Sequence, residues 1–327
     1  MNRKELSERE HSLTMQILRD SDVVLCTLNM SGSRIMKDLL KGIINFDVVV
    51  IDEGSQSMEP ETWIAARHAK KLIIAGDHLQ LPPTVTCPEV ASDLGKTLFE
   101  RLIGMYPREP VYNLLDTQYR MHKDIMNWSN MAMYEGRLRA DACVATHRLC
   151  DLDNVVNNEL TCTPIVFYDT IGCDMLESLN DDINDNSLDV ESRSNEGEAR
   201  ICIRHLNELL ASGLRHDQIA IITPYNAQVS LIKSLLGDGS MDASSLEIGS
   251  VDGFQGREKE AIIFSFVRSN DSGELGFLSD TRRTNVAWTR ARRQLCVVGD
   301  SGTLERHPFY KQLIEYLQEH ADVRFPS

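Results

Sequence analysis

Residues 48–56 read Val-Val-Val-Ile-Asp-Glu-Gly-Ser-Gln. A short β-branched apolar run that ends in two carboxylates is typical of a buried parallel strand, which carries its acidic tip to the edge of a sheet. Phosphate–metal chemistry needs this placement, with one carboxylate to hold Mg²⁺ and one to orient an attacking water. Asp52 and Glu53 are therefore the first candidates for a functional site.

The same pattern of a short Val- and Ile-rich run with a polar tip recurs along the chain. It is found at residues 72–75, 219–222, 261–267 and 295–298, and further strands are expected at Val23–Leu25 and Ile165–Asp169. Amphipathic stretches such as Glu198–Ala211 and Ala227–Leu236 separate several of these runs. The alternation predicts an α/β fold of doubly wound parallel sheets, with ligands at the carboxyl ends of the strands.

Other helices are expected from patterns of apolar spacing. They cover residues 1–20, Ser33–Lys41, Pro60–Ala69, Asp93–Ile103 and Ile125–Met133. A connector rich in Gly and Pro at Gly104–Pro110 predicts a boundary near Arg108. The expected domains are therefore residues 1–108 and 109–327, and the second carries an acidic insert at about 175–198.

Length and composition fit a globular protein. The chain has 327 residues and shows neither an apolar stretch near twenty residues nor a charged-then-apolar leader, so no membrane span and no signal peptide are predicted. Its eight cysteines are scattered, which favours a reducing compartment, the nucleus or the cytoplasm; Cys26, Cys202 and Cys296 are expected to be buried. Cys143, His147 and Cys150 match no zinc-binding spacing, so no metal other than Mg²⁺ is expected.

The net charge of −15 does not exclude nucleic acid, because most of it is local. Between Asp151 and Glu198 there are thirteen acidic residues and one basic residue. Much of this segment reads as a mobile, solvated loop, and the rest of the chain is nearly neutral. A basic cluster comprises Arg282, Arg283, Arg290, Arg292 and Arg293.

Six blocks of sequence, taken together and in order, are far more specific than any single strand. They are residues 52–56 (DEGSQ), 76–83 (GDHLQLPP), 118–122 (QYRMH), 223–228 (TPYNAQ), 251–258 (VDGFQGRE) and 285–292 (NVAWTRAR). Their order resembles the later motifs of superfamily 1 helicases of the Upf1-like branch. The C-terminal third is most similar to the immunoglobulin mu-binding type within that branch.

The resemblance implies two RecA-like domains, with ATP and Mg²⁺ as cofactors and single-stranded DNA or RNA as partner. The implied activity is that of a 5′-to-3′ DNA/RNA helicase, a nucleic-acid-stimulated ATPase. Motif by motif, it implies one role for each of seven residues: Mg²⁺ binding for Asp52, general base for Glu53, γ-phosphate sensing for Gln80, adenine stacking for Tyr119, phosphate contact for Arg120, ribose contact for Glu258 and the arginine finger for Arg290.

The chemistry of these residues agrees with the resemblance. Guanidinium groups neutralise a developing phosphoryl charge better than ammonium groups do. The acids come from the first expected domain and Arg120 and Arg290 from the second, so domain closure would assemble the site. The simpler readings are that Asp52 and Glu53 start a helix and that the arginines form a solvated surface.

Small hydroxyls, glycine amides and an aromatic ring suit sequence-independent binding of a nucleic-acid strand. The candidates are Thr27, Ser31, Thr223, Tyr225, Asn226, Ser250 and Gly256. Tyr225 could equally be a core aromatic residue at the end of its strand.

The phosphate-binding pattern G-x-x-x-x-G-K-[ST] does not occur in the sequence. Gly95-Lys96-Thr97 is not a substitute, because Val90 stands where the first glycine belongs and no buried strand precedes it. The expectation is a chain that begins after the phosphate-binding loop, with an incomplete first domain and no turnover alone. The alternatives are a non-catalytic nucleic-acid-binding remnant, or complementation by another chain that supplies the loop. Two departures from the family pattern are Gly54 and Trp288; the latter is expected to disturb the packing of Arg290.

Overall fold

The structure is a computed structural model that describes residues 3–41, 46–85, 87–106, 111–179, 192–237 and 245–326. The chain divides into two compact units, Met1–Asn113 (unit 1) and Leu114–Ser327 (unit 2). The expected boundary residue Arg108, and residues 180–191 of the expected acidic insert, lie outside the described residues.

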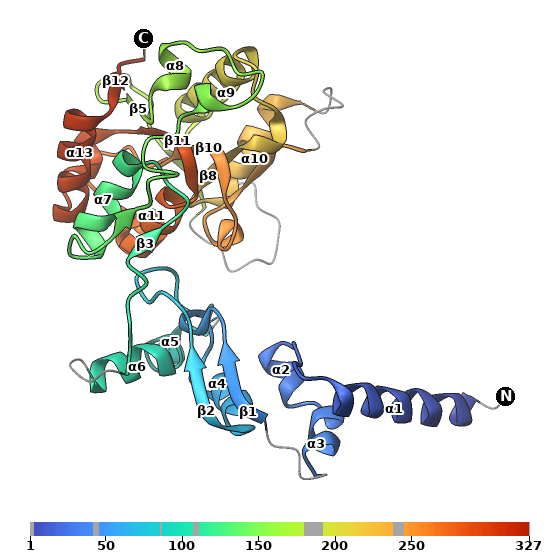
Figure 1. The fold of residues 1–327 in the computed structure, drawn as a ribbon. Helices are drawn as coiled ribbons and strands as arrows, with labels where there is room; N and C mark the ends of the chain where they lie inside the picture. Colours follow the sequence, from blue (N-terminus) through green and yellow to red (C-terminus); the bar gives the residue numbers. More distant parts are fainter. Residues whose placement is uncertain are drawn as a thin grey trace. The chain divides into compact units, whose positions relative to one another are not determined.

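Unit 1 contains a two-stranded parallel sheet with short helices around it (Figure 1). Val49 of one strand pairs with Leu72 of the other, so the acidic tip and the tip at Gly76 lie at the same end of the sheet. The elements are α1 (Arg3–Asp20), α2 (Leu28–Ser31), α3 (Arg34–Lys41), β1 (Phe46–Ile51), η1 (Gly54–Gln56), α4 (Glu59–Ala66), β2 (Ala69–Ile74), α5 (Pro88–Leu94) and α6 (Leu98–Met105).

Two of the expected elements of unit 1 are wrong. Val23–Leu25 is not a strand; the side chain of Leu25 is 91% exposed, and no described strand pairs with this segment. The expected helix Asp93–Ile103 is interrupted after Leu94. Thr97 starts α6 instead, because its Oγ1 accepts a hydrogen bond from the Glu100 amide and the Glu100 carboxylate accepts one from the Thr97 amide. Gly95-Lys96-Thr97 is therefore a helix boundary.

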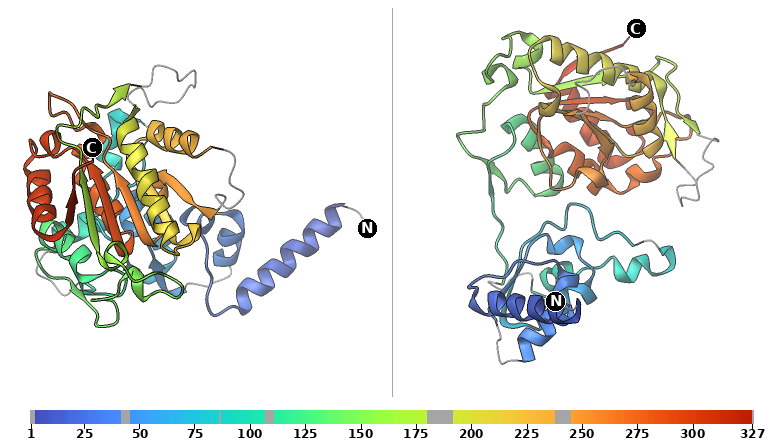
Figure 2. Two further views of the ribbon diagram at one scale, coloured as in Figure 1. Left: turned by 90° about the horizontal axis from the view of Figure 1, so that it is seen from above. Right: turned by 90° about the vertical axis from the view of Figure 1, so that its right-hand side faces the viewer.

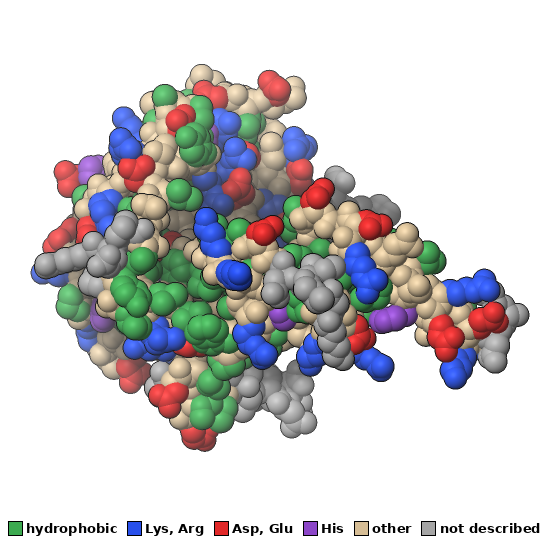
Figure 3. Space-filling model, turned by 60° about the horizontal axis from the view of Figure 1, so that its bottom comes forward, with side chains coloured by type: hydrophobic (Ala, Val, Ile, Leu, Met, Phe, Trp, Pro, Cys, Tyr) green, Lys and Arg blue, Asp and Glu red, His purple; other side chains and the backbone are tan. Residues whose placement is uncertain are grey.

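The described part of unit 1 has a small core and an apolar surface. One buried cluster contains Met15, Met36 and Leu39. In Figure 3 acidic and basic side chains lie along α1. The face of the molecule seen in this view also carries patches of apolar side chains. Exposed apolar residues on the strands and on α4 include Val48, Val50, Trp63 and Ile73. Cys26 is also exposed, which corrects its expected burial.

Unit 2 is built on a six-stranded parallel sheet in the order β12-β5-β11-β10-β8-β9. Its main elements are α7 (Lys123–Met133), β5 (Ile165–Asp169), α9 (Glu196–Ala211), β8 (Ile219–Thr223), α10 (Asn226–Leu236), β9 (Glu247–Ser250), β10 (Lys259–Ser265), α11 (Thr281–Trp288), β11 (Ala291–Gly299), α13 (Pro308–His320) and β12 (Asp322–Arg324). The expected doubly wound α/β fold is confirmed here.

Short elements join these layers. They are β3 (Thr117–Gln118), β4 (Arg139–Ala140), η2 (Leu149–Asp151), α8 (Glu159–Cys162), β6 (Ser178–Leu179), β7 (Arg193–Ser194), η3 (His216–Gln218), η5 (Asp252–Phe254), η6 (Gly276–Ser279) and α12 (Ser301–Leu304). β3 pairs with β4 in parallel, and β6 pairs with β7 in antiparallel.

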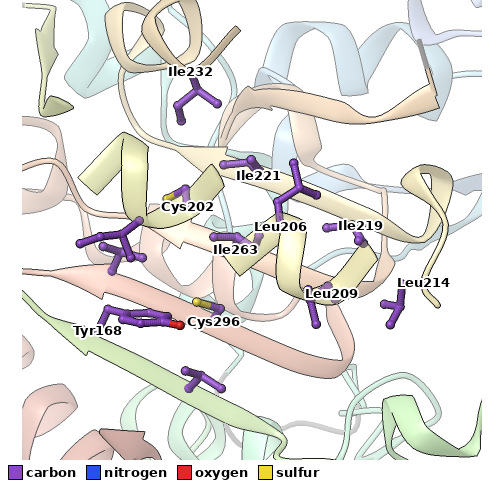
Figure 4. Close-up of a cluster of buried hydrophobic side chains, with 14 of the residues drawn as sticks. Tyr168, Cys202, Leu206, Leu209, Leu214, Ile219, Ile221, Ile232, Ile263 and Cys296 are labelled. Carbon is purple, nitrogen blue, oxygen red and sulfur yellow. The ribbon is translucent and has the colours of Figure 1, made fainter. Parts of the chain in front are cut away.

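Helices cover both faces of the unit 2 sheet. α9 and α10 lie on one face, and α7, α11 and α13 lie on the other (Figures 1 and 2). Because both faces are covered, the strands are almost continuously apolar, as parallel strands require. Figure 4 shows the core beneath α9, where Ile221, Ile263 and Cys296 of three adjacent strands meet Cys202 and Leu206.

No helix in the described parts of the chain combines the length and apolar character needed to cross a membrane.

Candidate nucleotide site

The acidic tip of β1 has an unusual backbone. Glu53 lies in the left-handed region at φ 52°, which is rare for residues other than glycine, asparagine and aspartate. The Asp52 carboxylate accepts a hydrogen bond from the Glu53 amide at 3.0 Å, and the Glu53 carboxylate accepts one from the Gln56 side chain at 2.7 Å. Strained residues of this kind cluster at functional sites. Both carboxylates are exposed, so they are accessible to a ligand.

Two glycines let the tips of β1 and β2 approach each other. The Gly54 amide donates to the Ala75 carbonyl at 2.7 Å, and a Cβ at Gly54 would overlap the methyl group of Ile74. A Cβ at Gly76 would lie 2.8 Å from the Ser55 amide nitrogen. This close packing leaves no room for a side chain at position 54, which explains why a glycine stands there.

The tip of β2 is fixed to the acidic tip. The Ser55 hydroxyl accepts a hydrogen bond from the Asp77 amide at 3.0 Å, and the Asp77 carboxylate accepts hydrogen bonds from the Leu79 amide and the Gln80 side chain at 3.0 and 2.9 Å. Unit 1 therefore holds Asp52, Glu53 and Gln80 at one end of its sheet.

In unit 2 an ion-paired cluster joins three of the sequence blocks. The guanidinium of Arg120 pairs with the Glu258 carboxylate, which also accepts from Arg292 at 3.2 Å. Arg120 and Glu258 are 138 positions apart in the sequence. Arg120 further donates to the Thr289 carbonyl at 3.2 Å. The fold thus brings together two residues to which the resemblance gives roles at one nucleotide.

Tyr119 lies beside this cluster with 64% of its surface exposed. The turn that carries it is folded around the Gln118 side chain, which accepts hydrogen bonds from the amides of Arg120 and Met121 at 2.8 and 2.7 Å. The Met121 carbonyl accepts from the same side chain. An exposed ring on such a well-fixed turn is suited to stacking on a flat ligand.

Arg290 is only 2% exposed. Its guanidinium donates to the carbonyls of Val286 and Arg257 at 2.9 and 3.3 Å and to the Thr289 hydroxyl at 2.9 Å. Trp288 is fully buried, and its indole donates to the Ile125 carbonyl, so it packs between α11 and α7. The expected disturbance of Arg290 by Trp288 is absent from these contacts.

Among the candidates for nucleic-acid contact, Tyr225 and Thr223 are corrected by their burial. Tyr225 is 1% exposed, and its hydroxyl donates to the Leu275 carbonyl, so its ring is a core aromatic residue and cannot stack on a base. Thr223 is fully buried. Asn226 begins α10 on the surface, and Ser250 ends β9 half-buried.

Of the three further candidates, Gly256 lies at a turn, and Thr27 and Ser31 lie at the two ends of α2. Gly256 is exposed at φ 77° with open space around it, a conformation that favours glycine. Thr27 is exposed, but its hydroxyl caps α2 by accepting from the Met30 amide at 3.3 Å. Ser31 is buried, and its hydroxyl donates to the Leu28 carbonyl.

A buried carboxylate that sequence reasoning missed supports the carboxyl end of β10. Glu198 of α9 is fully buried, and its Oε2 accepts from the Ser265 hydroxyl at 2.6 Å and from the Val267 amide at 2.8 Å. Asn195 donates to the Val267 carbonyl at 3.2 Å. These bonds hold Val267 in the left-handed region, at φ 72°. Glu198 could have been found from its position four residues before Cys202 on the apolar stripe of α9.

Burial raises the pKa of Glu198 to about 8. A folded-state pKa above the unfolded value gives stability that is complete at low pH and is lost as the pH rises through about 8. The loss occurs between the ordinary glutamate pKa of 4.5 and the folded-state value of about 8. Over this pH range we expect the unfolding free energy of the wild type to fall, relative to that of Glu198→Gln, by about 1.4 kcal/mol per pH unit. Urea unfolding at pH 5–8, followed by tryptophan fluorescence, measures this difference. Trp128 and Trp288 are buried in unit 2 and report its unfolding.

The control is Glu196→Gln, an exposed carboxylate at the start of the same helix. Its difference from the wild type should stay constant over the same pH range. Parallel pH curves for the wild type and Glu198→Gln would contradict the assignment of this pH dependence to Glu198.

No group of three or more His, Cys, Asp or Glu side chains that could hold a metal occurs among the described residues. Cys143, His147 and Cys150 belong to no such group. His147 contacts the Arg292 carbonyl at 2.8 Å through Nε2, and the His122 amide donates to the same carbonyl at 2.8 Å. These two residues position the backbone of Arg292, whose side chain pairs with Glu258.

Comparison with known proteins places these sites in a family. Residues 94–302 and residues 1–88 each match a family described as AAA domain. The chain is 45% identical to DNA-binding protein SMUBP-2 of Mesocricetus auratus, over 98% of this chain and 31% of that protein. It is 40% identical to DNA polymerase alpha-associated DNA helicase A of Saccharomyces cerevisiae, over 99% of this chain and 49% of that protein.

A third relative is Regulator of nonsense transcripts 1 of Dictyostelium discoideum, at 35% identity over 94% of this chain and 22% of that protein. The chain thus spans half or less of the length of these three relatives. The matches confirm the resemblance that the six blocks indicate, and the chain belongs to the AAA-domain family and, within it, to the Upf1-like branch of the superfamily 1 helicases.

Proposed function

We propose that this chain contributes two RecA-like parts to an ATP-dependent 5′-to-3′ helicase that acts on DNA or RNA. The observation that supports the proposal most strongly is the Arg120–Glu258 ion pair beside the exposed ring of Tyr119. An exposed ring for the base, a carboxylate for ribose hydroxyls and guanidiniums for phosphates are together suited to a nucleotide.

In this proposal Tyr119 stacks on adenine, Glu258 accepts from the ribose and Arg120 binds phosphate. The ion pair between Arg120 and Glu258 keeps both side chains in place before the nucleotide arrives. Binding then costs less side-chain entropy than it would for two unpaired long side chains.

The acidic tip of unit 1 has the donor set that Mg²⁺ prefers, since the Asp52 carboxylate is an exposed oxygen ligand at a strand end. Mg²⁺ supplies neutralising charge to phosphate oxygens when it is bound. In our proposal Glu53 accepts a proton from the hydrolytic water, and its contact with Gln56 orients the carboxylate. Gln80 is oriented by Asp77 and senses the γ-phosphate.

For the nucleic-acid strand we propose a track that includes Asn226, Ser250 and Gly256 of unit 2 and Thr27 of unit 1. The first three follow or end strands of the unit 2 sheet, and Gly256 offers open backbone. Polar groups and backbone amides of this kind contact phosphates and sugars without reading sequence. We place the protein in the nucleus or the cytoplasm.

Turnover in this proposal requires a polypeptide that carries the G-x-x-x-x-G-K-[ST] motif, because its amides and lysine grip the β- and γ-phosphates. The chain sequence does not contain that motif.

One observation favours a second candidate function, a nucleic-acid-binding or regulatory protein without hydrolysis. The Arg290 guanidinium donates hydrogen bonds to Val286, Arg257 and Thr289, which belong to its own unit. An arginine that stays in this arrangement stabilises unit 2 rather than a transition state. Nucleic-acid binding without turnover in the presence of the phosphate-binding motif would support this candidate.

The role of Tyr119 gives a direct test of nucleotide binding. With the phosphate-binding motif supplied, we expect Tyr119→Ala to raise KM for ATP by about tenfold, in line with the roughly 1–3 kcal/mol of base–aromatic stacking. Tyr119→Phe keeps the ring and should behave like the wild type. Equal KM values for the alanine variant and the wild type would remove Tyr119 from the site.

A further inference from the structure

Two cysteines of unit 2 lie sulfur to sulfur. The Cys162 thiol, at the end of α8, donates to the Cys150 sulfur in η2 at 2.7 Å. A disulfide bond is about 2.05 Å long, so the sulfurs need to approach by well under 1 Å to bond. We propose that Cys150 and Cys162 form a redox-modification site, which a small disulfide such as oxidised glutathione converts to an intramolecular disulfide.

The six other cysteines are also among the described residues, and Cys26 and Cys87 are exposed. Cys202 and Cys296 are buried in the core beneath α9 and are closed to reagents. Cys143 is exposed, and the Cys173 thiol donates to the Pro326 carbonyl. Cys150 and Cys162 are both half-buried, so a reagent can reach them.

The segments that carry the two thiols are fixed independently to adjacent residues of β11. Arg293 donates to the Arg148 carbonyl at 2.9 Å, two positions before Cys150. Gln294 donates to the Leu160 and Thr163 carbonyls at 2.7 and 3.0 Å, on either side of Cys162. Because the strand holds both segments, the thiols stay in contact without a covalent bond, and closure needs little movement of the backbone.

The reaction is a pair of thiol–disulfide exchanges. The Cys162 thiolate attacks one sulfur of oxidised glutathione, which forms a Cys162–glutathione bond and releases one glutathione thiolate. The Cys150 thiolate then attacks the Cys162 sulfur and releases the second glutathione. The two cysteines lose two electrons and two protons, and the reagent is reduced to two glutathione thiols.

Burial of Cys150 disfavours its thiolate and raises its pKa to about 11. The thiolate is the attacking form, so Cys150 supplies little of it near neutral pH. The second exchange is favoured instead by geometry, because the Cys150 sulfur already lies against the Cys162 sulfur.

The test is peptide mapping of the native chain after incubation with oxidised glutathione, with free thiols then blocked and no reductant added. Trypsin cleaves after Arg148 and Glu-C after Glu159, so the digest separates Cys150 from both Cys143 and Cys162. We expect fragments 149–159 and 160–177 to remain linked, with a mass two hydrogen atoms lower than their sum, and to separate after reduction. The melting temperature of the oxidised chain should be higher than that of the reduced chain, because the bond closes a loop.

Fragment 160–177 also contains Cys173, so Cys173→Ser is the matched control and should retain the link. Cys150→Ser and Cys162→Ser should each lose it. A wild-type chain in which Cys143 becomes glutathionylated while fragments 149–159 and 160–177 stay unlinked would overturn the proposal. So would a link that persists in Cys162→Ser, or one that forms only under denaturing conditions.

Discussion

Glu53→Gln is expected to lower nucleic-acid-stimulated ATP turnover by about 10²–10⁴-fold, the usual contribution of a general base. The assay uses this chain fused to a segment of the family that carries G-x-x-x-x-G-K-[ST]. Glutamine keeps the size of the side chain but cannot accept the proton of the attacking water. The chain without that segment should show no measurable turnover, because it lacks the main phosphate-gripping groups.

Glu61→Gln is the control for this experiment, since it removes a carboxylate from α4 of the same unit. It should retain wild-type turnover. A fusion in which Glu53→Gln is as active as the wild type would show that another group acts as the base. Turnover by the unfused chain that disappears in Glu53→Gln would contradict the requirement for the phosphate-binding motif.

Arg290→Lys should lower the turnover rate by a similar factor. The contribution lost is the stabilisation of phosphoryl charge and not general-base catalysis. An arginine finger contributes about 10³–10⁵-fold to the turnover rate of phosphoryl-transfer enzymes. Lysine keeps the positive charge but loses the planar fork that can reach two phosphate oxygens. We therefore expect kcat of the fusion to fall by at least about 10³-fold, with a much smaller change in KM for ATP.

Because Arg290 is buried and bonded to Val286 and Thr289, the variant must also be checked for folding. Thermal melting followed by tryptophan fluorescence provides that check. Arg215→Lys is the matched control, since Arg215 is exposed and pairs with Asp217 elsewhere in unit 2. A folded Arg290→Lys variant with wild-type kcat would assign Arg290 a structural role only.

The sequence was sufficient to predict the four interior strands of the unit 2 sheet, because buried parallel strands are apolar at every position. Residues 219–222 and 295–298 are examples, and both lie in strands covered by helices on each face. It was not sufficient for the edge strands β9 and β12, which are only half-buried. It was also not sufficient for Val23–Leu25, which has a strand-like composition but no described neighbour to pair with. Strand propensity depends on partners that a local pattern does not contain.

The same contrast holds for the site residues, some of which could be predicted from sequence and some of which could not. The sequence blocks contain Arg120 and Glu258, but only the fold shows that they pair. Tyr225 could not be assigned from sequence, because an aromatic residue at a strand end suits both a ligand and a core; its buried hydroxyl decides for the core. The contact between Cys150 and Cys162 follows from two short helices that β11 holds, and these are too short to show a periodic pattern.

In our proposal Asp52 and Glu53 of unit 1 and Tyr119, Arg120, Glu258 and Arg290 of unit 2 act on one nucleotide. A crystal structure of the fusion with ADP, Mg²⁺ and tetrafluoroaluminate tests it most directly. We expect Glu53 to lie within hydrogen-bond reach of the attacking water and Arg290 within reach of the fluoride ligands, with Tyr119 stacked on adenine. A bound nucleotide that contacts Glu53 while Arg290 still donates to Val286 and Arg257 would contradict it.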